Sequence, residues 1–363
     1  MKKEIILFSS LIAAIVLTGA GCVSFGSKTD TGTLGVYRSE DKGESWKTAM
    51  AYPTSEGTKS LSGVNVYRLF QDPSDSNTVY LASRGQGLFY TYDNGNSWQS
   101  VAKFKSQFIY GVAIDPKNKC VIYATNGSNI YKSSDCSRNW DLVYTEGRQG
   151  ERFVGLAVDF ADSAVVYGAE YGGDVLVSRD SGQSWRAQKR FGFQLRDVAA
   201  DPLSPGRVYV ASYSKGLARS DDQGNTWQVF ADGFKAYSGA NNFSRLVLHP
   251  NQKDSLFWVS KYGILRSNDA GSTWSPIRLL TPPGSVNIFG FAVSSGDEKS
   301  MYYTGTVLGE NNEHVRSTFY KTDDGGNNWV TKKLPTNSVP AFLLVQPENN
   351  SMILMGFTNL QTN

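Results

Sequence analysis

A short motif ending in tryptophan occurs seven times along this chain of 363 residues and limits the folds that the chain can adopt. Each copy follows the pattern Ser/Thr-x-Asp-x-Gly-x-Ser/Thr-Trp with few departures. Successive motif tryptophans lie 52, 42, 45, 42, 47 and 55 residues apart. This spacing matches one four-stranded propeller blade per repeat. The conserved positions within the motif are Asp41, Asp93, Asp135, Asp180, Asp222, Asp269 and Asp324, with Trp46, Trp98, Trp140, Trp185, Trp227, Trp274 and Trp329.

The segments between the motifs have the pattern of short strands. In one repeat, apolar and aromatic residues fill positions 64–70, 78–82, 87–91 and 98–101, and turn residues such as Asp72 and Pro73 separate them. We name these four expected strands A, B, C and D, and the motif then joins C to D. Its Asp can accept hydrogen bonds from loop N–H groups, and its Gly permits a backbone conformation closed to other residues.

The two ends of the repeat region are incomplete in complementary ways. The first repeat begins in strand C at residues 35–39, and the last ends with strands A and B at 341–345 and 352–357. Pairing the N-terminal strands with the C-terminal strands in one sheet removes open sheet edges, which would otherwise promote aggregation. The sequence therefore predicts an all-β fold: a seven-bladed β-propeller of four-stranded antiparallel blades, with one composite blade joining the N- and C-terminal segments.

The motif resembles the Asp-box, also called the bacterial neuraminidase repeat, and the resemblance covers nearly the whole chain after the leader. The repeats are similar to sortilin-type and xyloglucanase-type propellers, and the chain is similar to photosystem II assembly-factor-like propeller lipoproteins. The resemblance implies that the boxes are scaffold on one face. It places recognition on the opposite face, which we call the mouth, where the D–A and B–C connections lie.

The first residues have the pattern of an export signal. Lys2 and Lys3 precede an apolar run over residues 5–17, which is too short to span a bilayer. Small residues then lead to Cys22, and the segment resembles a bacterial lipoprotein processing site with Cys22 as the lipidated residue. We expect a lipoprotein signal peptide at 1–21, a flexible tether at 22–33 and one propeller domain at 34–363. This predicts an extracytoplasmic, membrane-attached lipoprotein, with ordinary secretion as the alternative.

Two further cysteines, Cys120 and Cys136, suggest a disulfide in an exported protein. If residues 121–125 and 130–133 form a hairpin, opposed positions sum to about 255, so Cys120 and Cys136 would lie opposite one another. Two free thiols are the alternative. Cys136 belongs to the third motif, in which Ser137 replaces Gly, so the bridge would brace a poorer loop.

Charge and residue counts exclude several kinds of function. The net charge of +3 is too near balance for a protein that binds nucleic acid over its whole surface. The boxes lack the ligand spacing of an EF-hand, because each runs into a tryptophan and a strand. Only two histidines exist: we interpret His249 as a turn residue and place His314 in an exposed loop. We therefore predict no metal, no cofactor and no nucleic-acid partner.

Aligning the A strands on the Asp-Pro turns predicts which residues reach the mouth. Arginine forks suit carboxylates or phosphates, and tyrosine faces suit sugars, peptides or cations. The alternative is that the arginines pair with Glu151, Glu170 and Asp197 while the tyrosines pack between blades. The predicted ligand-binding residues are Asn65, Arg68, Arg152, Gln194, Arg196, Asn242, Arg245, Asn287, Tyr171, Tyr213 and Tyr262.

These residues favour a non-catalytic propeller that binds a protein or peptide partner, one with acidic or C-terminal carboxylate groups, at a basic and aromatic mouth. A polysaccharide-binding protein and a glycoside hydrolase are the alternatives. For a hydrolase the candidate catalytic carboxylates are Glu151 and Asp197. The Arg-Ile-Pro segment that is typical of sialidases does not occur in the sequence.

Overall fold

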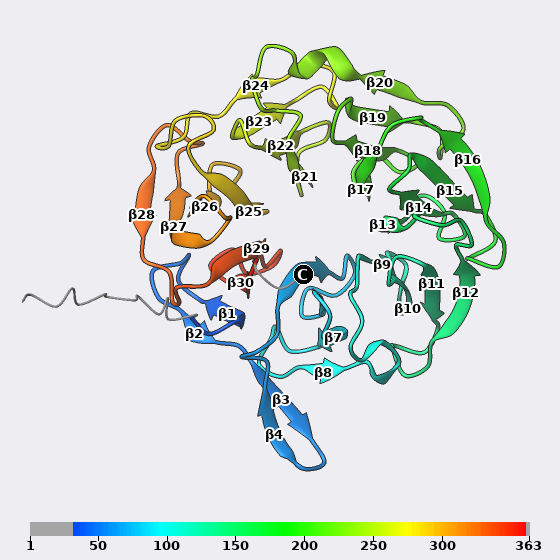
Figure 1. Cartoon of the computed structure of the whole chain (residues 1–363), viewed down its shortest axis with the longest axis horizontal. Helices are drawn as coiled ribbons and strands as arrows, with labels where there is room; N and C mark the ends of the chain where they lie inside the picture. Colours follow the sequence, from blue (N-terminus) through cyan, green and yellow to red (C-terminus); the bar gives the residue numbers. More distant parts are fainter. Residues whose placement is uncertain (1–31, 361–363) are drawn as a thin grey trace, which may run out of the picture. The chain divides into compact units, whose positions relative to one another are not determined.

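The computed structural model of the chain describes residues 32–360. These residues form seven four-stranded antiparallel sheets arranged as a ring (Figure 1). Helical structure within them is limited to two short 3-10 turns, η1 (Ala102–Phe104) and η2 (Ala231–Phe234). The predicted seven-bladed propeller of antiparallel blades is confirmed.

Six blades consist of four consecutive strands that run in order from the axis of the ring, strand A, to its rim, strand D (Figure 1). Blades 1 and 2 comprise β5 (Val66–Gln71), β6 (Val79–Ser83), β7 (Leu88–Thr91) and β8 (Gln99–Ser100), then β9 (Gly111–Asp115), β10 (Asn118–Thr125), β11 (Asn129–Ser133) and β12 (Asp141–Thr145). Blades 3 and 4 comprise β13 (Phe153–Val158), β14 (Val166–Glu170), β15 (Asp174–Ser178) and β16 (Arg186–Arg190), then β17 (Leu195–Ala200), β18 (Val208–Ser212), β19 (Gly216–Ser220) and β20 (Gln228–Phe230). Blades 5 and 6 comprise β21 (Phe243–Leu248), β22 (Leu256–Ser260), β23 (Ile264–Ser267) and β24 (Ser275–Pro276), then β25 (Asn287–Val293), β26 (Met301–Leu308), β27 (His314–Thr322) and β28 (Val330–Lys332).

The seventh blade is composite, as predicted. Its inner strands β29 (Val339–Val345) and β30 (Ile353–Thr358) come from the end of the chain, and its outer strands β1 (Gly35–Ser39) and β2 (Lys47–Thr48) come from the beginning. β1 pairs with β30 from Gly35 opposite Phe357 to Ser39 opposite Ile353. The ring is therefore closed by backbone hydrogen bonds between segments that are far apart in sequence.

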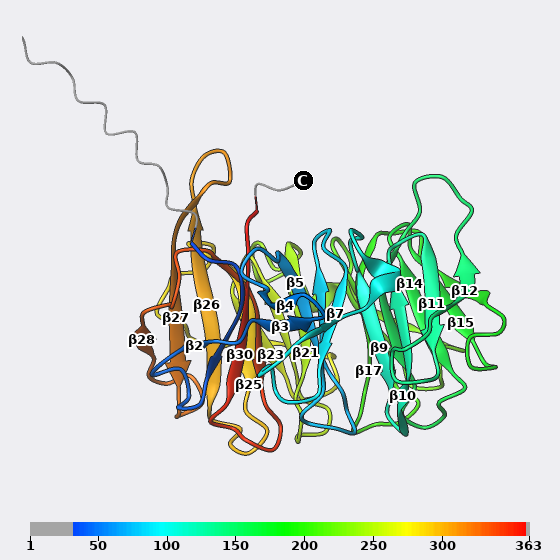
Figure 2. The ribbon, with the colours of Figure 1, turned by 90° about the horizontal axis from the view of Figure 1, so that it is seen from below.

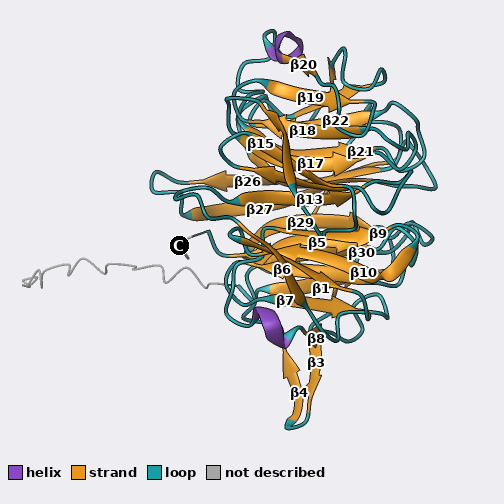
Figure 3. Cartoon of the chain, turned by 90° about the vertical axis from the view of Figure 1, so that its right-hand side faces the viewer, coloured by secondary structure: helices purple, strands orange, loops and turns teal. Residues whose placement is uncertain are grey.

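A feature that the repeat pattern did not predict is a hairpin of β3 (Ala51–Thr54) and β4 (Gly57–Ser60), inserted between blade 7 and blade 1. It stands away from the ring (Figures 1 and 3). All four residues of β4 are exposed, and Tyr52 Oη lies 2.8 Å from Ser100 Oγ at the rim of blade 1.

The core lies between neighbouring blades, where B-strand tyrosines are fully buried. Tyr80, Tyr123 and Tyr167 are 0% exposed, as are their counterparts in later blades. Tyr123 Oη donates to the carbonyl of Ser181 in the next blade at 2.9 Å. Burial of one such aromatic side chain contributes about 2 kcal/mol or more, so these residues join the blades.

The antiparallel order assigns the connections to two faces. The boxes, which join C to D, share one face with the A–B turns, and we call this the box face. The B–C turns and the D–A connections share the other face, the mouth. From the side, the long β26–β27 loop and the β12–β13 connection rise on the mouth side (Figure 2). Residues 32–360 include no helix that is long and apolar enough to cross a membrane.

Candidate functional site

The Asp-boxes form closed hydrogen-bond circuits. In the second box, Asp93 Oδ1 accepts from Thr91 Oγ1 at 2.7 Å and from the backbone N–H of Ser97 at 2.9 Å, and Asp93 Oδ2 accepts from Ser97 Oγ at 2.7 Å. Thr91 Oγ1 in turn accepts from the N–H of Gly95 at 3.0 Å. The other boxes repeat these bonds. Each carboxylate is therefore occupied by its own loop.

The same hydrogen bonds keep the box carboxylates ionised. The Ser45 hydroxyl lowers the pKa of Asp41 to about 2, and the Ser184 hydroxyl lowers the pKa of Asp180 to about 2. The backbone N–H of Asn328 is the main cause that lowers the pKa of Asp324 to about 2. The pKa values of the four remaining box aspartates are also lowered.

The box glycines meet two demands at once. Gly182 has φ +86°, in the left-handed region, and a Cβ built on it would lie 2.9 Å from Tyr123 Cε1 of the preceding blade. Both conditions select glycine. In the third box Ser137 takes the place of this glycine, with φ 68°. Its Oγ lies 3.0 Å from Tyr80 Oη of the preceding blade, so the additional side chain forms a hydrogen bond there.

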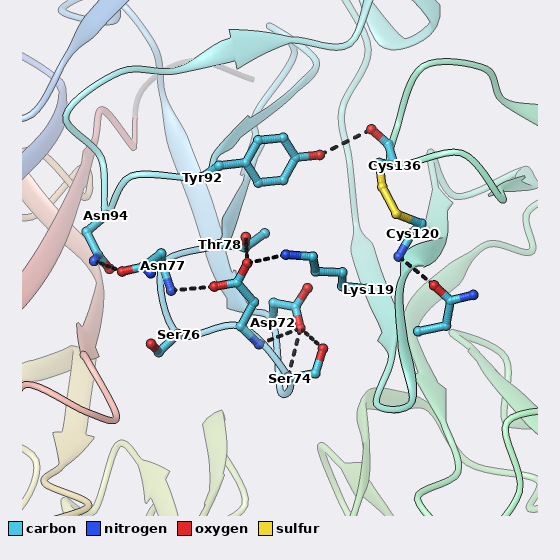
Figure 4. Close-up of polar contacts among 12 residues, drawn as sticks. Asp72, Ser74, Ser76, Asn77, Thr78, Tyr92, Asn94, Lys119, Cys120 and Cys136 are labelled. Atoms are coloured by element: carbon cyan, nitrogen blue, oxygen red, sulfur yellow. Dashed lines mark hydrogen bonds and ion pairs between the residues drawn. A yellow bond between two sulfur atoms is a disulfide. The ribbon is translucent and has the colours of Figure 1, made fainter.

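Neighbouring blades are clasped on the box face. The residue at the position before each box glycine has a positive φ. At five of these positions, the carbonyl of that residue accepts a hydrogen bond from a side chain of the preceding blade. Tyr92 Oη, for example, donates to the carbonyl of Cys136 at 3.2 Å, and Cys136 is joined to Cys120 by a disulfide (Figure 4). The other four clasps run from Arg38 to Asn94 (3.3 Å), Lys132 to Ser181 (2.9 Å), Arg179 to Gln223 (2.9 Å) and Arg219 to Ala270 (2.8 Å).

The mouth carries a different arrangement, a row of arginines between aromatic rings. Arg152 Cζ lies 4.1 Å from the ring centre of Tyr171 and 6.0 Å from that of Tyr110. Arg196 Cζ lies 5.1 Å and 5.0 Å from the ring centres of Tyr171 and Tyr213. These distances are within the range of cation–π attraction.

The row continues into blade 1. Arg84 Cζ lies 5.2 Å from the ring centre of Tyr67 and 6.0 Å from that of Phe108, and Phe108 stacks on Tyr110 at 4.3 Å. We call the set the arginine band, and it crosses blades 1 to 4. Its members are Arg84, Arg152 and Arg196 with Tyr67, Phe108, Tyr110, Tyr171 and Tyr213.

The arginines of the band have no acceptors. Within residues 32–360, the side chains of Arg84, Arg152 and Arg196 make no hydrogen bond and no ion pair, and the Nε atoms of Arg84 and Arg196 are buried without a partner. Burial lowers the pKa of Arg84. Buried donors are normally bonded, so the unpartnered Nε atoms of Arg84 and Arg196 set the band apart from the arginines of the box face.

Two further arginines lie at the axis. Arg68 Nη1 of blade 1 pairs with Asp197 Oδ1 of blade 4 at 2.8 Å. Arg245 Nη2 donates to the carbonyl of Ala341 at 3.2 Å, and its Cζ lies 3.7 Å from the ring centre of Phe342. Of the four predicted mouth arginines, the structure places Arg152 and Arg196 in the band and Arg68 and Arg245 at the axis, and it pairs only Arg68 with a carboxylate.

The other predicted ligand residues differ in their freedom to bind. Asn65 is buried, and its Oδ1 accepts from Thr358 Oγ1 and from the N–H of Asn359, so it holds the end of the ring. Gln194 and Asn242 are exposed, and neither side chain has a hydrogen-bond partner among the described residues. Asn287 Oδ1 accepts from Lys261 Nζ at 3.4 Å.

Tyrosine and amide side chains beyond the band line two smaller pockets. Tyr213, Asn242, Lys261 and Asn287 line a cavity of about 220 Å³ next to the end of the band. Tyr262 packs against Tyr237 and lines a separate cavity of about 280 Å³ at the Pro282–Pro283 loop. Tyr262 therefore does not contact the arginine band.

The two candidate catalytic carboxylates are both engaged. Glu151 Oε2 accepts from the N–H of Gly172 at 2.9 Å, and Asp197 is the partner of Arg68. No contact between Glu151 and Asp197 is present among the described residues. The structure instead reveals the carboxylate pair Glu146 and Glu170; the sequence analysis missed Glu146 and named Glu170 only among the alternative partners of the arginines.

Glu146 and Glu170 both contact the same nitrogen, Nη2 of Arg148, and both side chains are buried. Hydrogen bonds from Arg148 lower the pKa of Glu146, whereas burial raises the pKa of Glu170. Glu170 occupies the last position of a B strand, where blades 1, 2 and 4 have Ser83, Thr125 and Ser212. That departure from the repeat was the signal in the sequence.

Two aromatic residues of the band, Tyr67 and Tyr110, were also missed. Tyr67 follows the predicted residue Asn65 by two positions, and Tyr110 follows Phe108, which occupies the same place in the next repeat, by two positions. Arg196 follows Gln194 in the same way. Tyr67 and Arg196 are the residues that register shifts leave unpaired in β5 and β17, so the regular alternation of a strand could not predict where they point.

Histidines, metals and the leader complete the comparison with the sequence. His249 Nδ1 accepts from the N–H groups of Asn251 and Gln252, both at 3.2 Å, which is the role of the turn aspartates in other blades. No group of three or more His, Cys, Asp or Glu side chains among residues 32–360 is placed to hold a metal ion. Cys22 and the leader lie outside the described residues.

The chain is similar to proteins with different activities. A family model for sortilin, neurotensin receptor 3, matches residues 35–164. A xyloglucanase from a Paenibacillus species is 30% identical over 176 residues, which are 39% of this chain but only 17% of that enzyme. The chain thus spans a small part of this relative.

Solved structures share the fold at low identity. The GH74 xyloglucanase from Xanthomonas campestris superposes with a TM-score of 0.62 and 16% identity over 89% of this chain and 52% of its own. YCF48 bound to a D1 peptide superposes with a TM-score of 0.58 and 15% identity over 83% of this chain and 94% of its own. The chain is a seven-bladed Asp-box β-propeller, similar in fold both to xyloglucanases and to YCF48.

Proposed function

We propose that this protein is a non-catalytic propeller that binds an acidic segment of a protein partner across the arginine band. The proposal rests on the observation that Arg152 and Arg196 have no acceptor within residues 32–360. Both guanidinium groups are held in place by aromatic rings, so little side-chain entropy is lost when a carboxylate binds them. Hydrogen bonds from a charged donor to such an acceptor contribute about 1.5–3 kcal/mol each.

The geometry favours an anion over a neutral sugar. Neutral pyranose rings bind to open aromatic faces, but the Tyr171 ring is already in contact with both Arg152 and Arg196. The donor edges of the guanidinium groups are the part of the band left without partners. A ligand with several carboxylates, spaced to reach successive blades, satisfies them.

The relatives support a ligand at this fold without selecting one. The solved YCF48 structure contains a D1 peptide, whereas the xyloglucanases are named for a polysaccharide. Export to the extracytoplasmic side and lipid attachment at Cys22 belong to the same proposal and rest on the sequence of the leader. Replacing Cys22 with Ala would test them, because the variant should move from the membrane fraction to the soluble fraction of the cell envelope.

The binding proposal can be tested with a fluorescent hexaglutamate peptide and fluorescence anisotropy. We expect the double variant Arg152→Gln/Arg196→Gln to bind at least about tenfold more weakly than the original protein. Arg186→Gln is the matched control, because Arg186 is exposed on β16 and makes no side-chain contact among the described residues. Unchanged affinity in the double variant, or equal binding of hexaglutamine, would refute the proposal.

A glycoside hydrolase is the second candidate, and the similarity to xyloglucanases favours it. Glu146 and Glu170 have pKa values shifted in opposite directions, a pattern found in acid–base pairs. Their burial against Arg148 argues against direct access for a sugar chain. Release of reducing ends from xyloglucan, abolished by Glu170→Gln in a folded protein, would establish this candidate over the first.

A further inference from the structure

The axis of the ring holds an excess positive charge. Arg68 from β5, Asp197 from β17 and Arg245 from β21 converge there, so that one carboxylate faces two guanidinium groups. Asp197 already accepts from Arg68 Nη1 and from the N–H of Val198. Arg68 and Asp197 are also the charged side chains that act on Arg245.

The guanidinium group of Arg245 has few hydrogen-bond partners. Its Nε and Nη1 atoms are buried without a partner, and its single hydrogen bond runs from Nη2 to the carbonyl of Ala341. Burial, with repulsion from Arg68, lowers the pKa of Arg245 to about 9, so the group still carries its charge at neutral pH. An unneutralised buried cation is costly, and proteins usually supply a counter-charge for it.

A cavity with both polar and apolar walls adjoins these groups. Its volume is about 270 Å³, and Arg68, Asp197 and Phe342 form part of its wall. Phe342 is also the ring on which Arg245 stacks at 3.7 Å. The rest of the wall comes from the inner strands of blades 1 to 4, including Val112, Leu156 and Val198, and from Pro73 and Phe160 of the A–B turns on the box face.

We propose that the axial cavity binds a small monocarboxylate with an apolar tail, its carboxylate at Arg68 and its tail against the inner strands. Arg245 is not part of the cavity wall, but it stacks on Phe342, which is, so the carboxylate acts on Arg245 as a neighbouring counter-charge. The cavity has room for a short aliphatic or a single aromatic tail, since a cavity of about 150 Å³ accepts benzene. The site does not depend on the acidic partner proposed above, because it uses none of the arginines of the band.

Isothermal titration at constant chloride tests the site with two matched pairs of probes, benzoate against benzamide and butyrate against butyramide. We expect both carboxylates to bind, and each neutral amide to bind at least about tenfold more weakly. Arg245→Gln should weaken benzoate binding at least about tenfold, whereas Arg186→Gln should leave it unchanged. Equal binding of acid and amide would overturn the proposal.

A second measurement separates a binding role of Arg245 from a structural one. Without a carboxylate, Arg245→Gln should melt at a higher temperature than the original protein, because the variant lacks the unneutralised cation. Saturating benzoate should raise the melting temperature of the original protein and not that of the variant. A variant that melts lower, with or without benzoate, would assign Arg245 to structure and refute the site.

The tail can be tested apart from the charge. Leu156→Phe narrows the cavity without touching either arginine, and a melting curve shows whether the variant is folded. We expect the folded variant to bind benzoate at least about tenfold more weakly than the original protein and to keep the same affinity for acetate. Undiminished benzoate binding would place the ligand outside the cavity.

The two proposals can fail separately. If the protein binds benzoate but not hexaglutamate, the proposed function is wrong and this site stands. If it binds hexaglutamate but not benzoate, only the proposed function stands.

Discussion

Arginines on the two faces of the ring are held in opposite ways. On the box face, Arg219 Nε pairs with Asp221 at 2.8 Å and its Nη1 donates to the carbonyl of Ala270 at 2.8 Å. Arg38 and Arg179 likewise reach acceptors in the next blade. On the mouth face, Arg84, Arg152 and Arg196 are placed by aromatic rings and have no acceptors in residues 32–360.

This difference agrees with the proposed division of the ring into a scaffold face and a recognition face. A guanidinium whose donors are satisfied within the chain contributes to stability, and its removal leaves buried acceptors unpaired. A guanidinium that only stacks contributes little to folding but retains its donors for a ligand. The arginines of the box face therefore join neighbouring blades, whereas the arginines of the band keep donors on the mouth face that have no partner among the described residues.

The largest expected effect comes from opening the ring, on which both faces depend. A chain that ends at Pro335 lacks β29 and β30, so blade 7 loses its inner strands and β1 loses its partner. We expect loss of cooperative unfolding, measured by circular dichroism against temperature. A truncated chain that melts cooperatively at the original temperature would show that the composite blade is not needed for closure.

Removing one box carboxylate should have the next largest effect. Asp93→Ala leaves the N–H and hydroxyl of Ser97 and the hydroxyl of Thr91 without their acceptor. We expect the free energy of unfolding in urea to fall by about 2 kcal/mol. The exposed Asp232, which pairs only with Lys235, supplies the control Asp232→Ala, and an equal loss in both variants would remove the special role of the box.

A matched pair of arginine variants compares the faces directly. Arg219→Gln on the box face should reduce the free energy of unfolding by about 1–2 kcal/mol, since the carbonyl of Ala270 loses its donor and Asp221 keeps only its bond with Arg207. Arg196→Gln at the mouth should change it by less than about 0.5 kcal/mol. Chemical denaturation of both variants measures the difference, and similar losses would contradict the division into scaffold and recognition.

The smallest effect is a pH dependence of the box face. His249 accepts two N–H groups through Nδ1, so it must be neutral there, and burial followed by repulsion from Arg266 lowers its pKa. The folded state therefore binds a proton less readily than the unfolded state, and stability should decline as the pH falls below about 6.5. His249→Asn keeps the acceptor without the titration, so its stability should decline less over the same pH range. Parallel curves would assign the acid loss to other groups.

The sequence was sufficient to predict the ring because each repeat is defined by residues that are close together in the chain. Each box carries its own donors, acceptor and glycine, and the spacing of the tryptophans counts the blades. The incomplete first and last repeats also predicted the pairing of β1 with β30. The β3–β4 hairpin was not predicted, because it is an insertion between two repeats and follows no period.

The mouth was predicted only in part, since its contacts join residues from different blades. The alignment of A strands identified Arg152 and Arg196, and the adjacent loops gave Tyr171, but neither could show that one ring would contact both guanidinium groups. It also could not distinguish Asn65, which is buried against the end of the chain, from exposed amides such as Asn242. Glu146 lies in a D–A connection with no counterpart in the repeat, so only the fold brings it to Glu170.

The most direct test of the account follows the arginine Nε–H signals of isotope-labelled protein by nuclear magnetic resonance while hexaglutamate is added. The account predicts that the signals of Arg152 and Arg196 shift and exchange more slowly with solvent as the peptide binds, while those of Arg38 and Arg219 stay unchanged. Shifts confined to the box-face arginines, or bound peptide with no change at Arg152 and Arg196, would contradict it.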